Sequence, residues 1–352
     1  MSKTTGTDSM RYNKPWLSHH DQLELLKSRG LVVTDDAKAL EYLRRIGYYR
    51  LSGYWFAFRQ RSEPCCVWPR RQSGKKGKSV RVEQIALDEF KTGASFQDAV
   101  ELYVFDKQLR LLVLDALERI EVAFRVEISH TLGEYGPFAY LSPEHLFDDF
   151  AQAINQKTGI TDHQTWLQKQ AQMINRSREE FIRHNKAKYG LPLPIWIACE
   201  VWDFGTLSTL YGGMRQEDQD RIAARYGLSN GRVLASWLRS LNYLRNVCAH
   251  HSRLWNRNII DQPKKPDSGE VPLFEQAWQP GHENMLARVF VLLCVIQHLL
   301  NTINPCSSWW QRLKALLLAF PDLNHIGLDL KSMGVIEGWE QWSWPAGSNG
   351  RQ

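Results

Sequence analysis

Hydrophobic residues recur at three- and four-residue steps over most of the chain, which is the pattern of amphipathic helices. The clearest run begins after Ser95, and its apolar members include Leu102, Phe105, Leu109, Leu112, Ala116, Ile120, Phe124 and Ile128. This spacing predicts one helix of about 30 residues or more. Long stretches of strand-like alternation are absent from the sequence. The pattern therefore predicts an all-α protein.

Changes in this pattern divide the chain into five segments. The first is polar and predicted to be disordered, the third is a basic loop or β-excursion, and the last is a tail whose tryptophans should pack against the protein. The predicted segments are a disordered N-terminus (1–13), an N-terminal helical extension (14–60), the basic excursion (61–94), a helical core (95–320) and a C-terminal tail (321–352). Within the core, we expect a basic helix over 230–257 and a loop over 261–282.

Composition narrows the class of protein only a little. The chain is 43% hydrophobic and 23% charged, which is ordinary for a soluble globular protein. Its net charge of +6 permits a nucleic-acid partner without requiring one. The six cysteines form no CxxC pair, so neither a zinc site nor a disulfide framework is predicted, and we expect no cofactor. The longest apolar run, 289–296, is too short for a membrane span, which needs about 20 residues. With no apolar leader at the N-terminus, these features predict a cytoplasmic protein with no membrane partner.

One segment has an unusual charge pattern. Residues 221–260 contain seven arginines and no lysine, aspartate or glutamate, and tyrosines and tryptophans are interleaved with them. Arginine forks pair with phosphates, and aromatic rings stack on bases. The segment therefore indicates contact with RNA. The alternative is that these arginines pair with carboxylates elsewhere in the fold.

The candidate chemistry lies near the end of this segment, at Arg245, Asn246 and His250. Asn246 and His250 are four residues apart and share a helix face. The 2′-OH of RNA can attack its own adjacent phosphorus without a metal, and an imidazole can move the proton near neutral pH. A fixed guanidinium can stabilise the charge that develops on phosphorus. We therefore predict that His250 is the acid or base, Arg245 the phosphate stabiliser and Asn246 an orienting group.

Further RNA contacts are expected around this group. Arg253 and Arg257 continue the stripe of Asn246 and His250 if the helix persists, and His251 is either a supporting RNA contact or a structural residue. A metal site built from Cys248, His250 and His251 is disfavoured because adjacent histidines diverge on a helix.

Three other groups of residues can each be interpreted as part of the site or as ordinary structure. The Arg-x4-His spacing also occurs at Arg125 and His130, so spacing alone does not identify the site. Glu121 could face the site from the long helix, or form an ordinary salt bridge. Tyr49 and Arg50 are candidate RNA contacts, and the alternative is an aromatic core around a buried, paired arginine.

The segment RNVCAHHSRLWNR (245–257) resembles the signature of the Abi-like, or AbiD/AbiF-type, abortive infection proteins of the HEPN superfamily. The R-N-x-x-x-H motif of HEPN ribonucleases maps onto Arg245, Asn246 and His250. Further blocks that resemble this family, in the same order, are KPWLSHHDQLELLKSRGL with LRRIGYYRLSGYWFAFR, FDKQLRLLVLDALERIEVAFR, and PIWIACEVWDFGTLSTLY.

The resemblance implies an all-α HEPN-type helical bundle with an N-terminal helical extension. It implies metal-independent cleavage of RNA by a homodimer, in phage defence or as a toxin, with a small RNA or a protein as antidote. The alternative function is a non-catalytic HEPN protein that binds a structured RNA.

Overall fold

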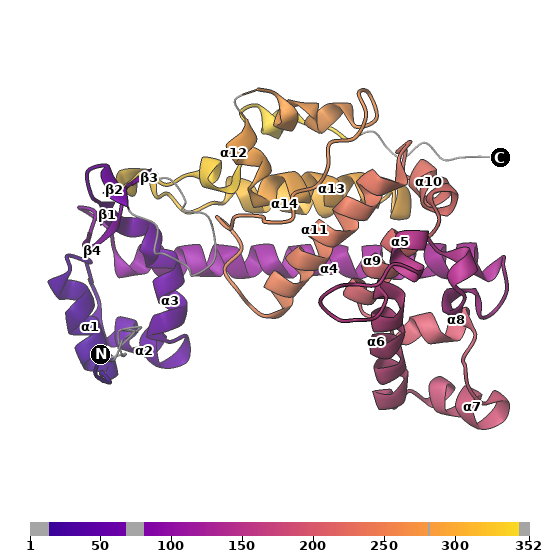
Figure 1. Cartoon of the computed structure of the whole chain (residues 1–352). Coiled ribbons are helices and arrows are strands. Elements are labelled where there is room, and N and C mark those ends of the chain that lie inside the picture. The colour runs from indigo at the N-terminus through magenta and orange to yellow at the C-terminus, as the bar shows by residue number, and fades with distance from the viewer. Residues whose placement is uncertain (1–13, 68–80, 281, 345–352) are drawn as a thin grey trace, which may run out of the picture. The chain divides into compact units, whose positions relative to one another are not determined.

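The computed structural model describes residues 14–67, 81–280 and 282–344 (Figure 1). The described chain is mainly α-helical, which confirms the predicted class, and its strands are few and short. The predicted disorder of residues 1–13 lies outside the described residues, as does the part of the predicted basic excursion at 68–80.

The chain forms two compact units. Unit 1 consists of the residues up to 103 together with 321–327, and unit 2 consists of 104–320 and the residues from 328 onward. The long helix α4 (Phe96–Gly133) contributes its start to unit 1 and the rest to unit 2.

Unit 1 combines short helices with two small antiparallel sheets. Ser18 is followed three residues later by Asp21, a spacing that predicts a capping box at the start of a helix. The structure confirms it at the first helix, where Asp21 N donates to Ser18 Oγ at 3.1 Å. In the predicted excursion, β1 pairs with β4 and β2 pairs with β3. Its elements are α1 (His19–Ser28), α2 (Asp36–Arg45), α3 (Tyr48–Trp55), η1 (Phe56–Phe58), β1 (Arg59–Arg61), β2 (Cys65–Val67), β3 (Arg81–Glu83), β4 (Ala86–Phe90) and η6 (Asn324–Ile326).

Unit 2 is helical in its described part. After α4 it contains η2 (Ala139–Leu141), η3 (Pro143–His145), α5 (Asp148–Ala151), α6 (Asp162–Arg176), α7 (Glu180–Tyr189), α8 (Ile195–Ala198), η4 (Cys199–Val201), α9 (Phe204–Gly213), α10 (Gln216–Arg225), α11 (Gly231–Ala249), η5 (Pro272–Trp278), α12 (Glu283–Leu286), α13 (Val289–Ile303), α14 (Trp309–Leu318), η7 (Leu330–Met333) and η8 (Trp339–Gln341). The predicted loop over 261–282 is therefore interrupted by the short helix η5.

Helix α4 supplies one wall of the unit 2 core. The apolar positions of its predicted stripe, from Phe105 to Phe124, are almost fully buried, with the exception of Leu112. The ring of Phe124 stacks on Tyr226 at 5.0 Å between centroids. Burial of each large apolar side chain is worth about 1.5–3 kcal/mol. The stripe that is visible in the sequence therefore provides much of the packing energy of this helix.

The C-terminal tail packs against unit 2, as its tryptophans predict. Trp339 is buried, and both Trp339 and Trp342 contact the ring of Phe290 in α13. Trp344 meets Trp310 edge to face at 5.5 Å. The tryptophan-containing part of the tail, from residue 328 onward, thus belongs to unit 2, whereas 321–327 belong to unit 1.

Helix α11 begins in close contact with α10. A Cβ on Gly231 would lie 2.4 Å from Cβ of Gln219 and 2.8 Å from the backbone nitrogen of Asp220. Real Cβ atoms do not approach other heavy atoms this closely, so only glycine fits at this position. The contact determines where α11 starts, and Figure 1 shows α11 running from this point obliquely to α4.

Candidate active site

Helix α11 ends in a Schellman motif immediately after the candidate residues. The N–H of His251 donates to Cys248 O at 3.0 Å, and the N–H of Ser252 donates to Val247 O at 2.9 Å. His251 takes the left-handed position of this motif with φ +54°, which is normally a glycine position. It is the one non-glycine residue with positive φ in the described ranges. Backbone strain of this kind is concentrated at functional sites.

This motif corrects the predicted helix over 230–257, which ends at Ala249 with His250 as its C-cap. The sequence contains no glycine or proline at this point that would have indicated the end. Because the helix stops, Arg253 and Arg257 do not continue the stripe of Asn246 and His250. That part of the prediction is wrong.

A buried ion pair on α4 holds the segment that follows the turn. Asp106 is 0% exposed and accepts the N–H of Leu254 at 3.1 Å and that of Trp255 at 2.7 Å. Arg110, one helical turn later, donates to Asp106 and also to Ser252 O at 3.4 Å. Both sides of the turn at His251 are therefore fixed, one by α11 and the other by α4.

The side chains of Asn246 and His250 are exposed at this end of α11. The imidazole of His250 has no hydrogen bond or ion pair to any described residue, and its backbone N–H donates to Asn246 O at 3.0 Å. A free imidazole on a fixed turn is available to a ligand.

Arg245 is half-buried and its charge acts on α4. Burial raises the pKa of Glu121, and the positive charges of Arg245 and Arg125 counteract this rise. Glu121 also accepts a hydrogen bond from Arg125 at 3.4 Å. Glu121 therefore forms the ordinary salt bridge that was one of the two alternatives, and a role at the candidate site stays a prediction. No hydrogen bond joins the side chains of Arg245 and His250.

The second Arg-x4-His pair is occupied by other contacts. Arg125 donates to Glu121, to Glu200 at 3.3 Å and to the carbonyl of Trp202 at 3.3 Å. His130 is 74% exposed and lies 4.0 Å from Glu134. Arg125 thus belongs to an ion-pair network.

The remaining predicted RNA contacts are divided between the two units. Arg257 donates to the hydroxyl of Tyr243 at 2.6 Å, with its guanidinium over that ring. Arg253 is half-buried and His251 is exposed. Tyr49 and Arg50 are both exposed and belong to unit 1, so the alternative of a buried arginine at position 50 is wrong.

Some arginines of 221–260 pair with carboxylates, which was the alternative prediction, and others do not. Arg221 pairs with Glu134 and Asp218, and Arg225 pairs with Glu127. Arg232 is bonded to Gln216, whereas Arg239 is exposed and has no partner among the described residues. The alternative that these arginines pair with carboxylates is therefore correct for Arg221 and Arg225.

Sequence reasoning missed Asp106 and Arg110. The available signal is a charged pair at i and i+4 whose first member lies four residues after Leu102 and three before Leu109. This spacing puts Asp106 on the apolar face of the predicted helix, which is unusual for a carboxylate that stays in water.

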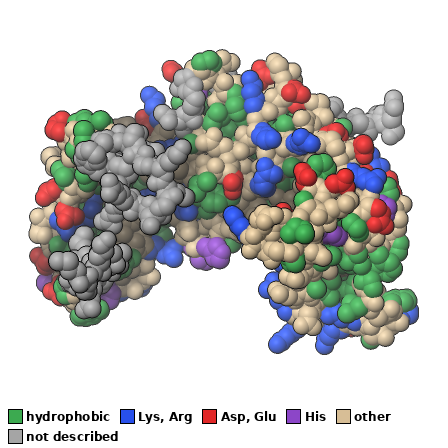
Figure 2. All heavy atoms as spheres, in the orientation of Figure 1, with side chains coloured by type: hydrophobic (Ala, Val, Ile, Leu, Met, Phe, Trp, Pro, Cys, Tyr) green, Lys and Arg blue, Asp and Glu red, His purple; other side chains and the backbone are tan. Residues whose placement is uncertain are grey.

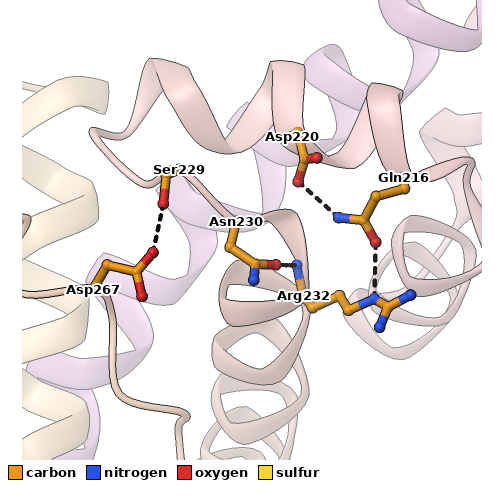
Figure 3. Close-up of a pocket in the computed structure, with 6 residues that line it drawn as sticks. All are labelled: Gln216, Asp220, Ser229, Asn230, Arg232 and Asp267. Carbon is orange, nitrogen blue, oxygen red and sulfur yellow. Dashed lines mark hydrogen bonds between the residues drawn. The ribbon is translucent and has the colours of Figure 1, made fainter.

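A pocket of about 440 Å³ lies at the other end of α11 (Figure 3). Its side chains bond one another: Gln216 Nε2 donates to Asp220 at 2.7 Å, Arg232 Nε donates to Gln216 at 2.8 Å, and Ser229 donates to Asp267 at 2.9 Å. Asn230 caps the helix by accepting the N–H of Arg232 at 2.9 Å. These contacts stabilise the start of α11.

Two classes of feature are not found in the described part of the chain. No group of three or more His, Cys, Asp or Glu side chains is placed to hold a metal ion. Burial raises the pKa of the Cys248 thiol to about 12, so this residue of the disfavoured metal site is a protonated core side chain. No described helix has the length and apolarity needed to cross a membrane.

Comparison with known proteins gives one match. Neither a curated protein nor a solved structure matches the chain. Residues 41–256, more than half of the chain, match the family described as Abi-like protein, and this span includes α4, the ion pair of Asp106 and Arg110, and all of α11. The chain therefore belongs to the Abi-like protein family.

Proposed function

We propose that this protein is a metal-independent endoribonuclease that cuts RNA by attack of the 2′-OH on the adjacent phosphorus. The observation that carries the proposal is the exposed imidazole of His250, which has no partner among the described residues. It lies on the same face as Asn246, at the end of a helix without acidic residues. The R-N-x-x-x-H motif of HEPN ribonucleases supports the same assignment.

In this mechanism His250 acts either as the base that removes the proton from the 2′-OH or as the acid that donates a proton to the leaving 5′-oxygen. Arg245 stabilises the negative charge on the phosphorane, and Asn246 orients the phosphate or the imidazole. Cleavage leaves a 2′,3′-cyclic phosphate on one fragment and a 5′-hydroxyl on the other. The nucleophile comes from the RNA itself, so the chemistry needs no metal.

The biological setting follows from the family. Membership in an Abi-like family suggests abortive infection, a defence against phage, in the cytoplasm where the RNA is located. One motif histidine per chain favours a homodimer with HEPN-type bundles, in which two His250 side chains act as acid and base. A small RNA or a protein antidote would hold the enzyme inactive before infection.

The test is cleavage of end-labelled single-stranded RNA in EDTA. Wild type should give fragments that end in 2′,3′-cyclic phosphate, and His250→Ala should abolish them while RNA binding persists. His130→Ala is the matched control, because His130 is also exposed and follows an arginine at the same spacing. Equal cleavage by wild type and His250→Ala would contradict the assignment of His250 as the catalytic acid or base.

A second assay tests whether the site is shared. Protomers that carry His250→Ala and protomers that carry Arg245→Ala are mixed after separate purification. Partial recovery of cleavage in the mixture indicates sites built from two chains. Expression of wild type and of His250→Ala in cells then shows whether growth arrest depends on the same histidine.

One observation favours the second candidate, an RNA-binding protein that does not cut. Arg245 acts on Glu121 of α4, and helix geometry puts it about 140° around α11 from His250. RNA that binds to wild type with salt-sensitive affinity and stays intact would select this function.

A further inference from the structure

We propose that Arg239 binds an RNA phosphate upstream or downstream of the cut, so that the exposed face of α11 is a track for the RNA backbone. The inference rests on the proposed function, since it extends the same site along the helix. In this proposal the main additional phosphate contact in residues 221–260 is Arg239, and no longer Arg253 and Arg257.

The first support is that the charge of Arg239 is not neutralised by any described residue. Arg239 is exposed, and its guanidinium has no hydrogen bond, ion pair or ring contact to any described residue. By contrast, Arg225 is paired with Glu127 and Arg257 is engaged with Tyr243. An unpaired guanidinium presents its full fork of donors, which matches the geometry of a phosphate.

The second support is position on the helix. Arg239 precedes His250 by eleven residues, which at 100° per residue leaves the two about 20° apart around the axis. The rise of 1.5 Å per residue separates them by about 16 Å along it. That distance is too long for one phosphate and suits two phosphates of one strand.

The face of α11 between these residues is polar and receives no acidic side chain from α11 itself, and Asp203 of the neighbouring α9 cap and Asn242 both approach Gly205. Asn242 and Asn246 lie on the same face, and residues 231–251 contain no aspartate or glutamate. Figure 2 shows blue Lys and Arg side chains in the region of α11, with red Asp and Glu side chains of the molecule beside them and purple His side chains at the lower end of the helix in this view. A polyanion that follows this face meets no carboxylate of α11.

The test is the salt dependence of RNA binding in the non-cleaving His250→Ala protein. Fluorescence anisotropy with a labelled single-stranded RNA is measured from about 50 to 300 mM salt. Each lost phosphate contact lowers the slope of log K against log salt by about 0.7 for a single strand. We expect Arg239→Ala to lower the slope by this amount and to weaken binding most at low salt. Arg239→Lys should keep the slope.

The control is Arg225→Ala, which removes an arginine that is 60% exposed and already paired with Glu127. Its slope should equal that of the parent. If Arg239→Ala leaves the slope of log K against log salt unchanged, Arg239 binds no phosphate and the track is overturned. If wild type nevertheless cleaves RNA, the proposed ribonuclease function stands without the track. A parent that binds no RNA at all overturns both.

Discussion

The backbone N–H of Trp255 donates to the carboxylate of Asp106 at 2.7 Å, across 149 residues of sequence. Asp106 is fully buried and is paired with Arg110, which is almost as buried. Through this contact helix α4 holds the segment after His250 in place. The geometry of the candidate site therefore depends on a residue in a distant part of the chain.

We expect Asp106→Asn to lower the free energy of unfolding by about 3–5 kcal/mol, because Arg110 would keep a buried charge without its partner. Urea denaturation measures the change. Asp115→Asn on the same helix is the control, since Asp115 is 44% exposed and its pairs with Arg119 and Arg312 are worth less than about 1 kcal/mol. Equal losses in the two variants would contradict the role of the buried pair.

Replacement of His251 tests the strain at the turn. His251→Gly should raise the free energy of unfolding by about 0.5–1 kcal/mol, because glycine adopts positive φ without the steric cost that other residues have. Ala249→Gly, in the last turn of α11, should lower it by about 1 kcal/mol. A loss of stability in both would show that the turn is not strained. RNA affinity of His251→Gly, measured in parallel, tests the predicted contact of this imidazole.

Two buried histidines predict how stability varies with pH. Burial lowers the pKa of His163 and of His298 below 6.5, although each ring hydrogen-bonds to a backbone carbonyl that favours the charged form. The unfolded chain then binds more protons than the folded one between the lowered pKa and 6.5. Stability should be full above about pH 6.5 and should fall as the pH drops below it.

Urea denaturation at pH 7.5 and pH 5.5 measures this fall. The variant His298→Gln removes one of the two titrating groups, so its pH dependence below 6.5 should be shallower than that of wild type. His130→Gln makes the same substitution at an exposed position and serves as the control. Stability that rises between pH 7.5 and 5.5 in wild type would refute the assignment.

The close approach of α10 and α11 predicts that Gly231 does not tolerate a side chain. Gly231→Ala should lower the free energy of unfolding by about 1–3 kcal/mol, because a Cβ would overlap Gln219. Gly212→Ala in α9 is the control, since no atom lies within 4 Å of its added Cβ. Its stability should be unchanged or slightly higher. Thermal unfolding of the two variants distinguishes them.

The sequence by itself determined the features that depend on local periodicity and local caps. The helical class, the extent of α4, the capping box at Ser18 and the packing of the C-terminal tryptophans were all predicted from apolar spacing and side-chain chemistry. Such features are encoded within a few residues of where they appear. For the same reason, the motif Arg245, Asn246 and His250 could be located without a structure.

Only the tertiary structure decided where α11 ends and which arginines pair with carboxylates. A histidine in the left-handed position gives no sequence signal, and it is held there by Asp106, which acts from another helix. Whether Arg225 or Arg239 is neutralised depends on a carboxylate that the fold brings close, as it brings Glu127 to Arg225. Contacts between distant residues set both outcomes, and no local pattern contains them.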